Sequence, residues 1–550
     1  MDTEPTSADL QFPPLDVSFK DDPRVLHEAT TEDYSKHVMP LTWRASKLSS
    51  IGAFWGLTSA MFWLIFAALI ALTVGSRNAI IGLVMAVVFY GVTNYFVQAY
   101  AARTGTSVAL FSRTLFGYHG AALAPLLFAA TAIYYAVFEG SVIAQVFKQY
   151  FGGSITLWYA VVIAYSIPIV FGGVLKFLDK FNGFLLPFYA VGVIGACIWS
   201  VVAYGYHSDW LSKSAPHALP VPGPGWLWAF TSYVALAIVY MYTWDYARFS
   251  KVSDAKFNGI VSYGVVFWSA TILINGLIGI FLTSNIPTNG PLSELSGVLG
   301  MVTMAGGWAV ALVWISQTRV NSVNMYVASS NLENFVARVF KVNLPRVFWV
   351  VVVGVICFVI MQTNVFTYIL KANQYQGVVV LAWVAVALCY ILGSHAHGTV
   401  AGNAEWRPGR VPPFDWGGLV GWAAGSAAGF VLLNTGSATS WTRTWTLPFT
   451  FVVAAVVYLL MLRFARQSWF VMERPGDPRL EVTDPWDARV RCYHCDKSYI
   501  ALEMDRDPGA GHQAICASCA QAIPHFYRHA RQEHARYVGS STQSATTGTG

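Results

Sequence analysis

Long apolar runs fill most of this 550-residue chain, and short polar stretches separate them. A membrane-spanning helix needs about 20 mostly apolar residues. The pattern predicts an all-α polytopic membrane protein with twelve transmembrane helices, at 51–74, 79–101, 121–148, 155–173, 182–205, 226–246, 258–284, 298–328, 347–362, 365–393, 416–435 and 446–465. The stretch 103–120 is amphipathic and contains glycine and arginine, so we expect it to lie at the membrane interface.

Charged residues gather at the two ends of the chain. Residues 1–50 carry 14 and residues 467–550 carry 19, whereas the 416 residues between them carry 29. Charged residues make up 11% of the chain and hydrophobic residues 55%, which excludes soluble, disordered and disulfide-scaffold classes. The net charge of +6 then reflects topology, and no nucleic-acid partner is expected.

The distribution of Lys and Arg predicts the orientation in the cytoplasmic membrane. With the N-terminus inside, the inner loops carry twelve Lys and Arg residues and the outer loops carry four. Positive charge is retained on the cytosolic side, so both termini are expected there. The polar start shows no cleavable signal peptide.

Composition divides the chain into five parts. We expect a cytosolic N-terminal segment at 1–45, a twelve-helix transporter domain at 46–466 and a proline-bearing linker at 467–489. A zinc-ribbon-like module at 490–522 follows, and a basic helix with a disordered tail completes the chain at 523–550.

Polar residues inside the apolar spans are costly and mark pathways or buried pairs. Glu139 lies in span 3, as a partner of substrate or proton or as the partner of an arginine. Gln317, Asn321 and Asn324 in span 8 share one helix face by their spacing. They form either interhelical hydrogen bonds or a site for a polar, planar ligand.

Hydroxyl and aromatic residues in these spans suggest a transporter. Ser59 in the middle of span 1 marks either close helix packing or a break that frees carbonyls for ions. Aromatic residues such as Trp63, Tyr135 and Tyr240 could stack on a flat ring, although packing explains most aromatics. We find no catalytic motif, so a secondary transporter is favoured over an enzyme.

Three motifs resemble those of the nucleobase:cation symporter family, especially its purine/cytosine permease members. They are Arg103-Thr-Gly105 with Ser112-Arg113-Thr-Leu-Phe116-Gly117, then Thr243-Trp-Asp245-Tyr-Ala-Arg248-Phe249, and Asn321-Ser-Val-Asn324-Met325-Tyr326. Their order, the span count and the orientation agree over residues 45–465. The resemblance implies a five-plus-five inverted repeat of the leucine-transporter type, in the amino-acid/polyamine/organocation superfamily, with two extra C-terminal helices and with spans 1 and 6 broken.

The resemblance also implies where substrate lies, between spans 1, 3, 6 and 8. Trp63 and Asn324 match substrate positions of spans 1 and 8, and Tyr240 is the loosely aligned span-6 aromatic. Tyr135 and Glu139 stand where the family usually has Trp and Asn or Gln, so both depart from its pattern. The expected substrate is cytosine or a purine first, then hydantoin, allantoin, uracil or a thiamine-like ring.

The coupling-ion region implied by the resemblance comprises Ser59, Phe62, Thr318 and Arg319. In sodium-coupled relatives the ion lies between span 1 carbonyls and span 8 hydroxyls, and Arg319 replaces one hydroxyl. A guanidinium repels sodium by about 4 kcal/mol at 4 Å and an effective dielectric of 20. We therefore expect sodium-independent transport driven by protons through Glu139. The alternative is that Arg319 points sideways and leaves a sodium site intact.

The tail carries four cysteines in the pattern C-x2-C-x20-C-x2-C, at Cys492, Cys495, Cys516 and Cys519. This spacing predicts one structural zinc ion, because two knuckles supply four thiolates in a cytosolic setting. The basic helix expected at 525–537 either caps the ribbon or touches anionic lipid. A transporter-like membrane sensor that signals through the ribbon to a cytosolic protein is the alternative from another class.

Overall fold

The computed structural model describes residues 12–31, 34, 36–171, 174–216, 223–288, 290–340, 342, 344–393, 399–400, 403–435 and 441–547. The helices are α1 (Pro23–Thr31), α2 (Lys47–Phe54), α3 (Phe62–Val74), α4 (Ser76–Thr104), α5 (Val108–Gly120), α6 (Leu123–Phe151), α7 (Ile155–Phe171), α8 (Val174–Tyr204), α9 (Gly225–Val234), α10 (Val239–Ala247), α11 (Ala255–Phe257), α12 (Val265–Trp268), α13 (Asn275–Asn285), α14 (Ser296–Ala305), α15 (Gly307–Val339), α16 (Arg346–Met361), α17 (Ile369–Gly393), α18 (Trp416–Asn434), α19 (Trp441–Phe464), α20 (Ala517–Ala522) and α21 (Phe526–Thr547). The strands are β1 (Val17–Ser18), β2 (Thr399–Val400), β3 (Asn403–Ala404), β4 (Arg489–Arg491), β5 (Ser498–Ile500), β6 (Met504–Asp507) and β7 (Gln513–Cys516).

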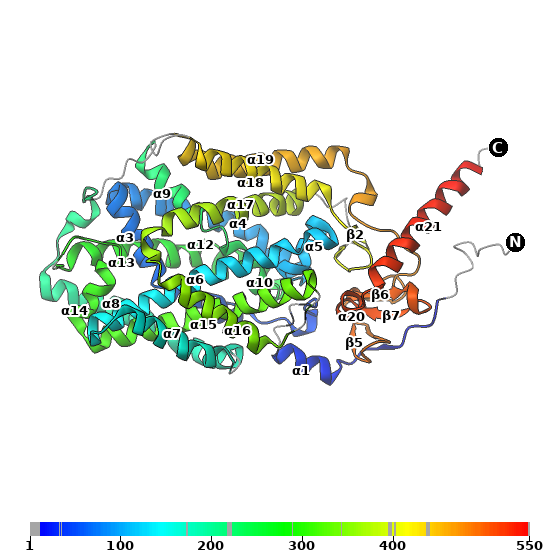
Figure 1. The fold of residues 1–550 in the computed structure, drawn as a ribbon, viewed down its shortest axis with the longest axis horizontal. Helices are drawn as coiled ribbons and strands as arrows, with labels where there is room; N and C mark the ends of the chain where they lie inside the picture. Colours follow the sequence, from blue (N-terminus) through cyan, green and yellow to red (C-terminus); the bar gives the residue numbers. More distant parts are fainter. Residues whose placement is uncertain are drawn as a thin grey trace.

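The helices of the apolar domain lie roughly side by side in one elongated bundle (Figure 1). Within the described residues, seven helical stretches are long and apolar enough to cross a membrane, and these are α4, α6, the 185–204 part of α8, 252–285, α17, α18 and α19. Two bent pairs, 47–59 with α3 and α9 with α10, add two spans. The shorter apolar helices α7 and α16 and the 33-residue α15 occupy the other three expected positions.

The expected start of span 8 at residue 298 is wrong. The chain turns at Gly306, whose φ of +55° favours glycine. Because of this turn α14 is a separate ten-residue helix, and the long helix begins at Gly307.

The stretch 103–120 forms α5, which begins after Gly105 ends α4 in a left-handed conformation. The Ser107 hydroxyl accepts a hydrogen bond from the Leu110 amide at 3.3 Å, and the Asp245 carboxylate accepts one from the Val108 amide at 2.8 Å. Most side chains of α5 are buried, because neighbouring helices and the polar end of the molecule cover it. Its place at the membrane interface stays a prediction.

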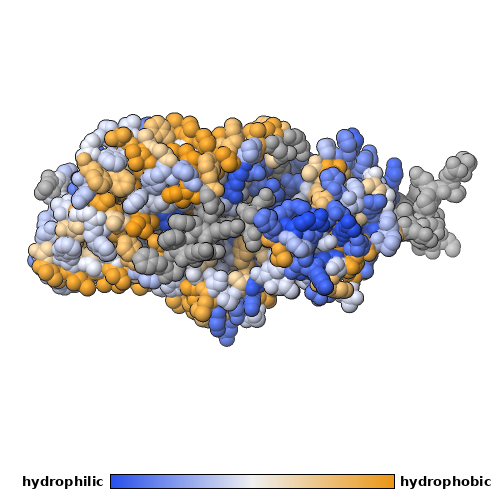
Figure 2. Space-filling view, turned by 90° about the horizontal axis from the view of Figure 1, so that it is seen from below, coloured by the Kyte–Doolittle hydropathy of each residue, from blue (hydrophilic) through white to orange (hydrophobic). Residues whose placement is uncertain are grey.

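The two ends of the chain fold together, which the sequence did not indicate. Strand β1 pairs with β4, joining Val17 to Val490, and β4 pairs with β5. We call residues 12–45 and 470–547 the terminal module. It lies at one end of the bundle, and Figure 2 shows hydrophilic residues gathered there and hydrophobic ones over much of the remaining surface.

Residues of the expected linker are buried inside the terminal module. Arg407, from the loop before α18, donates to both carboxylate oxygens of Asp477 at 2.7 Å and to Glu405 at 2.7 Å. Arg474 donates to Asp505 at 2.9 Å. Burial opposes the ionisation of Glu405 and Asp477, but the guanidinium of Arg407 holds the pKa of both carboxyls below their ordinary values. The segment is therefore fixed by ion pairs, and the domain boundary around it stays a prediction.

The terminal helix also differs from expectation. Residues 539–547 continue α21 as a helix, where the composition predicted disorder. Phe526 at its start is fully buried in the hydrophobic core of the module, and Glu533 accepts from Arg474 at 2.7 Å. The first turns of α21 therefore cap the cysteine-bearing module, as one of the two expectations for this helix proposed.

Candidate functional site

Span 1 is broken between α2 and α3, at the position that the hydroxyl residues indicated. A 3-10 turn at Trp55–Ser59 follows α2, Ala60 is extended, and the two helices are bent by 44°. A break within the apolar domain leaves backbone groups without helical partners, so each needs a polar partner.

Side chains of neighbouring helices satisfy the groups freed by this break. The Gln317 side chain accepts a hydrogen bond from the Met61 amide at 2.8 Å, and Asn275 donates to the Thr58 carbonyl at 2.8 Å. Arg319 donates to the Gly56 carbonyl at 3.0 Å and lies 3.4 Å from the Ser59 hydroxyl. A Cβ on Gly56 would lie 1.6 Å from the Arg319 guanidinium, so a larger residue there would displace this guanidinium.

Span 6 is broken between α9 and α10 although it holds no glycine or proline. The pair is bent by 42°, and the Tyr90 hydroxyl donates to the Tyr233 carbonyl at 2.7 Å. Tertiary contacts of this kind permit a break that local sequence does not force.

A cavity lies where the two breaks meet spans 3, 7 and 8. It is lined by Leu57, Ala60, Phe62, Trp63, Tyr135, Glu139, Ile238, Val239, Tyr242, Phe267, Trp268, Val320 and Asn324. Its volume is about 50 Å³, smaller than the roughly 150 Å³ of an engineered cavity that holds benzene. The cavity is therefore too small for a ligand the size of benzene in this conformation, and such a ligand could enter only if the lining moves.

Some of the predicted polar residues line the cavity, and others bond to residues around it. Glu139 and Asn324 line the cavity, and the Asn324 side-chain oxygen accepts from the Tyr242 hydroxyl at 2.9 Å. Gln317 lies behind Glu139, to which its amide donates. Asn321 points to α7 instead, where it donates to the Ser166 hydroxyl at 3.3 Å. Of the three carboxamides on one helix face, Asn324 alone is among the lining residues.

The predicted aromatic residues divide in the same way. Trp63 and Tyr135 line the cavity, with the ring of Phe62 edge-on to that of Tyr135 at 5.4 Å. Tyr240 does not line it, because its hydroxyl bonds to Thr93 on α4. The span-6 aromatic at the cavity is Tyr242, two residues further on.

Phe267 and Trp268 of span 7 also line the cavity, and sequence reasoning missed both. They lie between two π-helical turns, Asn258–Ser262 and Ser269–Ile274. Such turns often mark functional sites, but they are tertiary features that apolar periodicity does not reveal.

The Thr318 hydroxyl lies 2.9 Å from the Tyr165 hydroxyl on α7. The guanidinium of Arg319, the other span-8 residue of the expected coupling-ion region, lies at the Gly56 carbonyl of span 1. The part of Thr318 in ion coupling stays a prediction.

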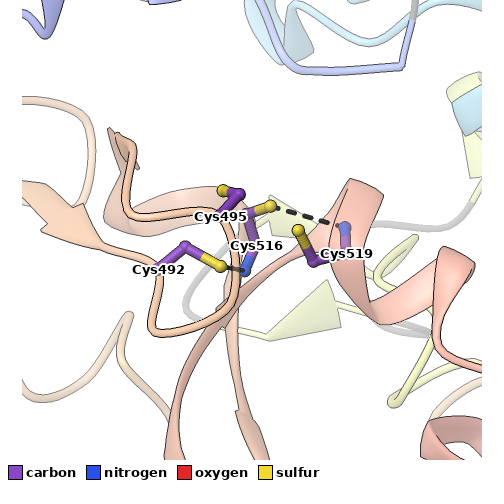
Figure 3. A group of neighbouring side chains, drawn as sticks. All are labelled: Cys492, Cys495, Cys516 and Cys519. Atoms are coloured by element: carbon purple, nitrogen blue, oxygen red, sulfur yellow. Dashed lines mark hydrogen bonds between the residues drawn. The ribbon is translucent and has the colours of Figure 1, made fainter.

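The four tail cysteines come together in the terminal module. Their sulfur atoms all lie within 4.8 Å of one another, and Figure 3 shows the four side chains, from two separate segments, around one small space. Backbone amides of Cys516 and Cys519 donate to the sulfurs of Cys492 and Cys516 at 3.3 and 3.4 Å. Tetrahedral zinc thiolate sites have sulfur atoms about 3.8 Å apart, given Zn–S distances near 2.3 Å. The four residues can therefore hold a metal ion.

No protein-family model and no curated protein sequence matches the chain. Among solved structures it is similar to Mhp1, a nucleobase-cation-symport-1 family transporter, in a closed conformation with bromovinylhydantoin bound. That match covers 79% of this chain and 97% of that chain, with 15% identity and a TM-score of 0.60. The inward-facing conformation of Mhp1 covers 78% and 95%, with 14% identity and a TM-score of 0.61.

A Na⁺-coupled sialic acid symporter in a substrate-bound, outward-open state is also similar. It covers 80% of this chain and 93% of that chain, with 12% identity and a TM-score of 0.52. At such identities the likeness establishes the fold. The chain is a multi-pass membrane protein with the fold shared by these symporters, and the resemblance drawn from its motifs is confirmed at that level.

Proposed function

We propose that this protein is a secondary active transporter that imports a nucleobase or a related planar heterocycle by alternating access. One observation carries this proposal: a cavity where two helix breaks meet, lined by aromatic rings, one carboxylate and one carboxamide. Aromatic faces stack on a flat ring, and the carboxamide pairs with a donor–acceptor edge. Glu139 favours an edge rich in N–H donors.

Cytosine and purines are the first substrates to test, and hydantoins are the next. The similar structure of Mhp1 holds bromovinylhydantoin, a substituted hydantoin, whose planar ring also carries N–H donors and carbonyl acceptors. The test is uptake of radiolabelled bases into proteoliposomes, with competition by a panel of nucleobases, hydantoins and allantoin. Binding without accumulation would instead favour a membrane sensor.

We propose that transport is coupled to protons rather than sodium. The Arg319 guanidinium lies at the Gly56 carbonyl and near the Ser59 hydroxyl, where its charge takes the place of a cation. Glu139 lines the cavity and is the candidate proton carrier. Uptake should be unchanged when choline replaces sodium, and should respond to a proton gradient. Clear sodium dependence would contradict this proposal. Sodium is the ion to test because a symporter of similar fold is Na⁺-coupled.

We propose that the cysteine cluster binds one structural zinc ion and that the terminal module lies in the cytosol. The four thiolates suit zinc, and β1–β4 pairing brings both ends of the chain to one side. The excess of Lys and Arg in the loops of that side supports the cytosolic assignment.

A further inference from the structure

A cleft of about 520 Å³ lies between the end of α5 and the beginning of α21, where the apolar domain meets the terminal module. Its polar lining comes from His119 on α5, from Gln521, and from Arg528, Arg531 and Gln532 on α21. No carboxylate is among the lining residues that the structure describes. The wall formed by α20 and α21 therefore presents two positive charges and two side-chain amides, and His119 faces the cleft from α5.

The walls of this cleft are fixed to each other. The rings of Tyr118 and Tyr527 stack with centroids 4.1 Å apart and an interplanar angle of 16°. The Tyr527 hydroxyl donates to the Val411 carbonyl at 3.3 Å, and Arg113 on α5 donates to the Gln521 side chain. The cleft thus exists before any ligand arrives, so a ligand meets little ordering cost there.

Two arginines of the cleft differ from most arginines of the terminal module. Those within 4.0 Å of a carboxylate include Arg24, Arg474, Arg479, Arg489, Arg491 and Arg506. For Arg528 and Arg531 the described part of the chain provides no carboxylate within that distance. Arg528 instead lies 3.1 Å from a ring nitrogen of His525. Both guanidinium groups are exposed and face the cleft with their charge uncompensated.

The cleft lies at the level where a membrane would end. The His119 amide donates to the Pro413 carbonyl at 2.9 Å, and its ring lies 5.6 Å from that of Phe414. Phe414 is 41% exposed and Trp416, the first residue of α18, is 53% exposed. Exposed aromatic side chains at the end of a span are typical of the lipid–water interface.

We propose that this cleft binds the phosphate of an anionic phospholipid headgroup. Arg528 and Arg531 contact the phosphate, His119 and the amides bind the remaining headgroup oxygens, and the acyl chains run along the exposed apolar side chains at the start of α18. Arginine suits this task because its planar donor fork matches phosphate oxygens. The bound lipid fastens the terminal module to the membrane.

The test uses the purified full chain in detergent, with binding measured by native mass spectrometry. Phosphatidylglycerol, phosphatidylcholine and inorganic phosphate are added separately. We expect phosphatidylglycerol to bind, and we expect the double variant Arg528→Gln, Arg531→Gln to weaken it on the order of 25-fold, about fivefold for each arginine. Arg536→Gln is the matched control, since it removes the same charge from the same helix outside the cleft, and should change binding less than twofold.

Three outcomes would overturn the proposal. Equal binding of phosphatidylcholine would show that charge does not select the lipid, and full binding by the double variant would place the site elsewhere. Inorganic phosphate that competes as tightly as the lipid would identify a soluble phosphorylated ligand instead. His119→Glu, on the opposite wall, gives a second measurement that does not alter α21, and it should also weaken phosphatidylglycerol binding.

Discussion

The terminal module and the cavity between the two helix breaks stabilise buried charge in opposite ways. In the apolar domain, Glu139 accepts from the neutral amide of Gln317, and Arg319 donates to a backbone carbonyl. Where the loop before α18 packs into the terminal module, Arg407 lies between the carboxylates of Glu405 and Asp477 with almost no exposure. Because its partner is a neutral amide, Glu139 can gain or lose a proton without breaking an ion pair. Carboxylates cancel the charge of Arg407 and fix the loop that carries it.

The largest effect should follow loss of the proposed metal site. Cys516→Ser in the full chain should abolish zinc binding and unfold the terminal module, because structural zinc contributes roughly 10–16 kcal/mol in small zinc domains. Zinc analysis and limited proteolysis of the tail measure this. Cys389→Ala, a single cysteine of α17, is the control and should retain both zinc and protection. A metal-free protein whose tail still resists proteolysis would show that zinc does not hold the module together.

The next largest effect should come from the ion pairs of the module. Arg407→Met removes the shared partner of Glu405 and Asp477, which keep only the longer ion pairs to Arg479 at 3.2 Å and to Arg410 at 3.7 Å. The loss should destabilise the module by about 3 kcal/mol, the low end expected for breaking a buried ion pair. Arg491→Gln, whose side chain is 51% exposed beside Asp16 and Asp496, should cost less than about 1 kcal/mol. Denaturant dependence of tail proteolysis compares the two. Equal costs would show that burial does not distinguish these pairs.

A smaller effect is expected at the cavity. Asn324→Ala should weaken substrate binding by about 1–3 kcal/mol, because a buried hydrogen bond is lost and the Tyr242 hydroxyl is left without its acceptor. Asn321→Ala is the matched control on the same helix face, since Asn321 bonds to Ser166 outside the cavity. Its affinity for transported bases should stay at the wild-type value. If both variants bind alike, the substrate site lies elsewhere.

The variant Glu139→Gln tests whether this carboxyl of the apolar domain carries the coupled proton. It removes the charge and keeps the shape, so we expect uptake to lose its response to a proton gradient while exchange of substrate across the membrane persists. Proteoliposome uptake with and without an imposed pH gradient measures this. An unchanged gradient response would assign the proton to another group.

The smallest effect is expected from pH between 8 and 5 on the module. Arginine partners hold the pKa values of Glu405 and Asp477 below their ordinary 4.5 and 3.8. A carboxyl with a lowered pKa stabilises the fold above its unfolded pKa, and this contribution is lost as pH falls through its folded value. Tail proteolysis should therefore be flat from pH 8 to 5. Faster proteolysis of the tail in this pH range, at constant zinc content, would contradict the ion pairing of Glu405 and Asp477.

The sequence by itself determined the features that local pattern encodes. Apolar runs place the spans because the bilayer demands about 20 apolar residues for each. The tail spacing brings four cysteines together, and Thr58 and Ser59 mark the break in span 1. Trp63, Tyr135, Glu139 and Asn324 line the cavity, at positions that the family resemblance singled out on spans 1, 3 and 8.

Tertiary structure alone decided which distant segments meet. The choice of Tyr242 over Tyr240 depends on the bend between α9 and α10, which Tyr90 stabilises from another helix. The pairing of Val17 with Val490 joins residues far apart in the chain, and Trp268 reaches the cavity through π-helical turns. Periodicity reports which side of a helix is apolar, whereas contacts between remote segments depend on how all the faces pack at once, and no local pattern records that.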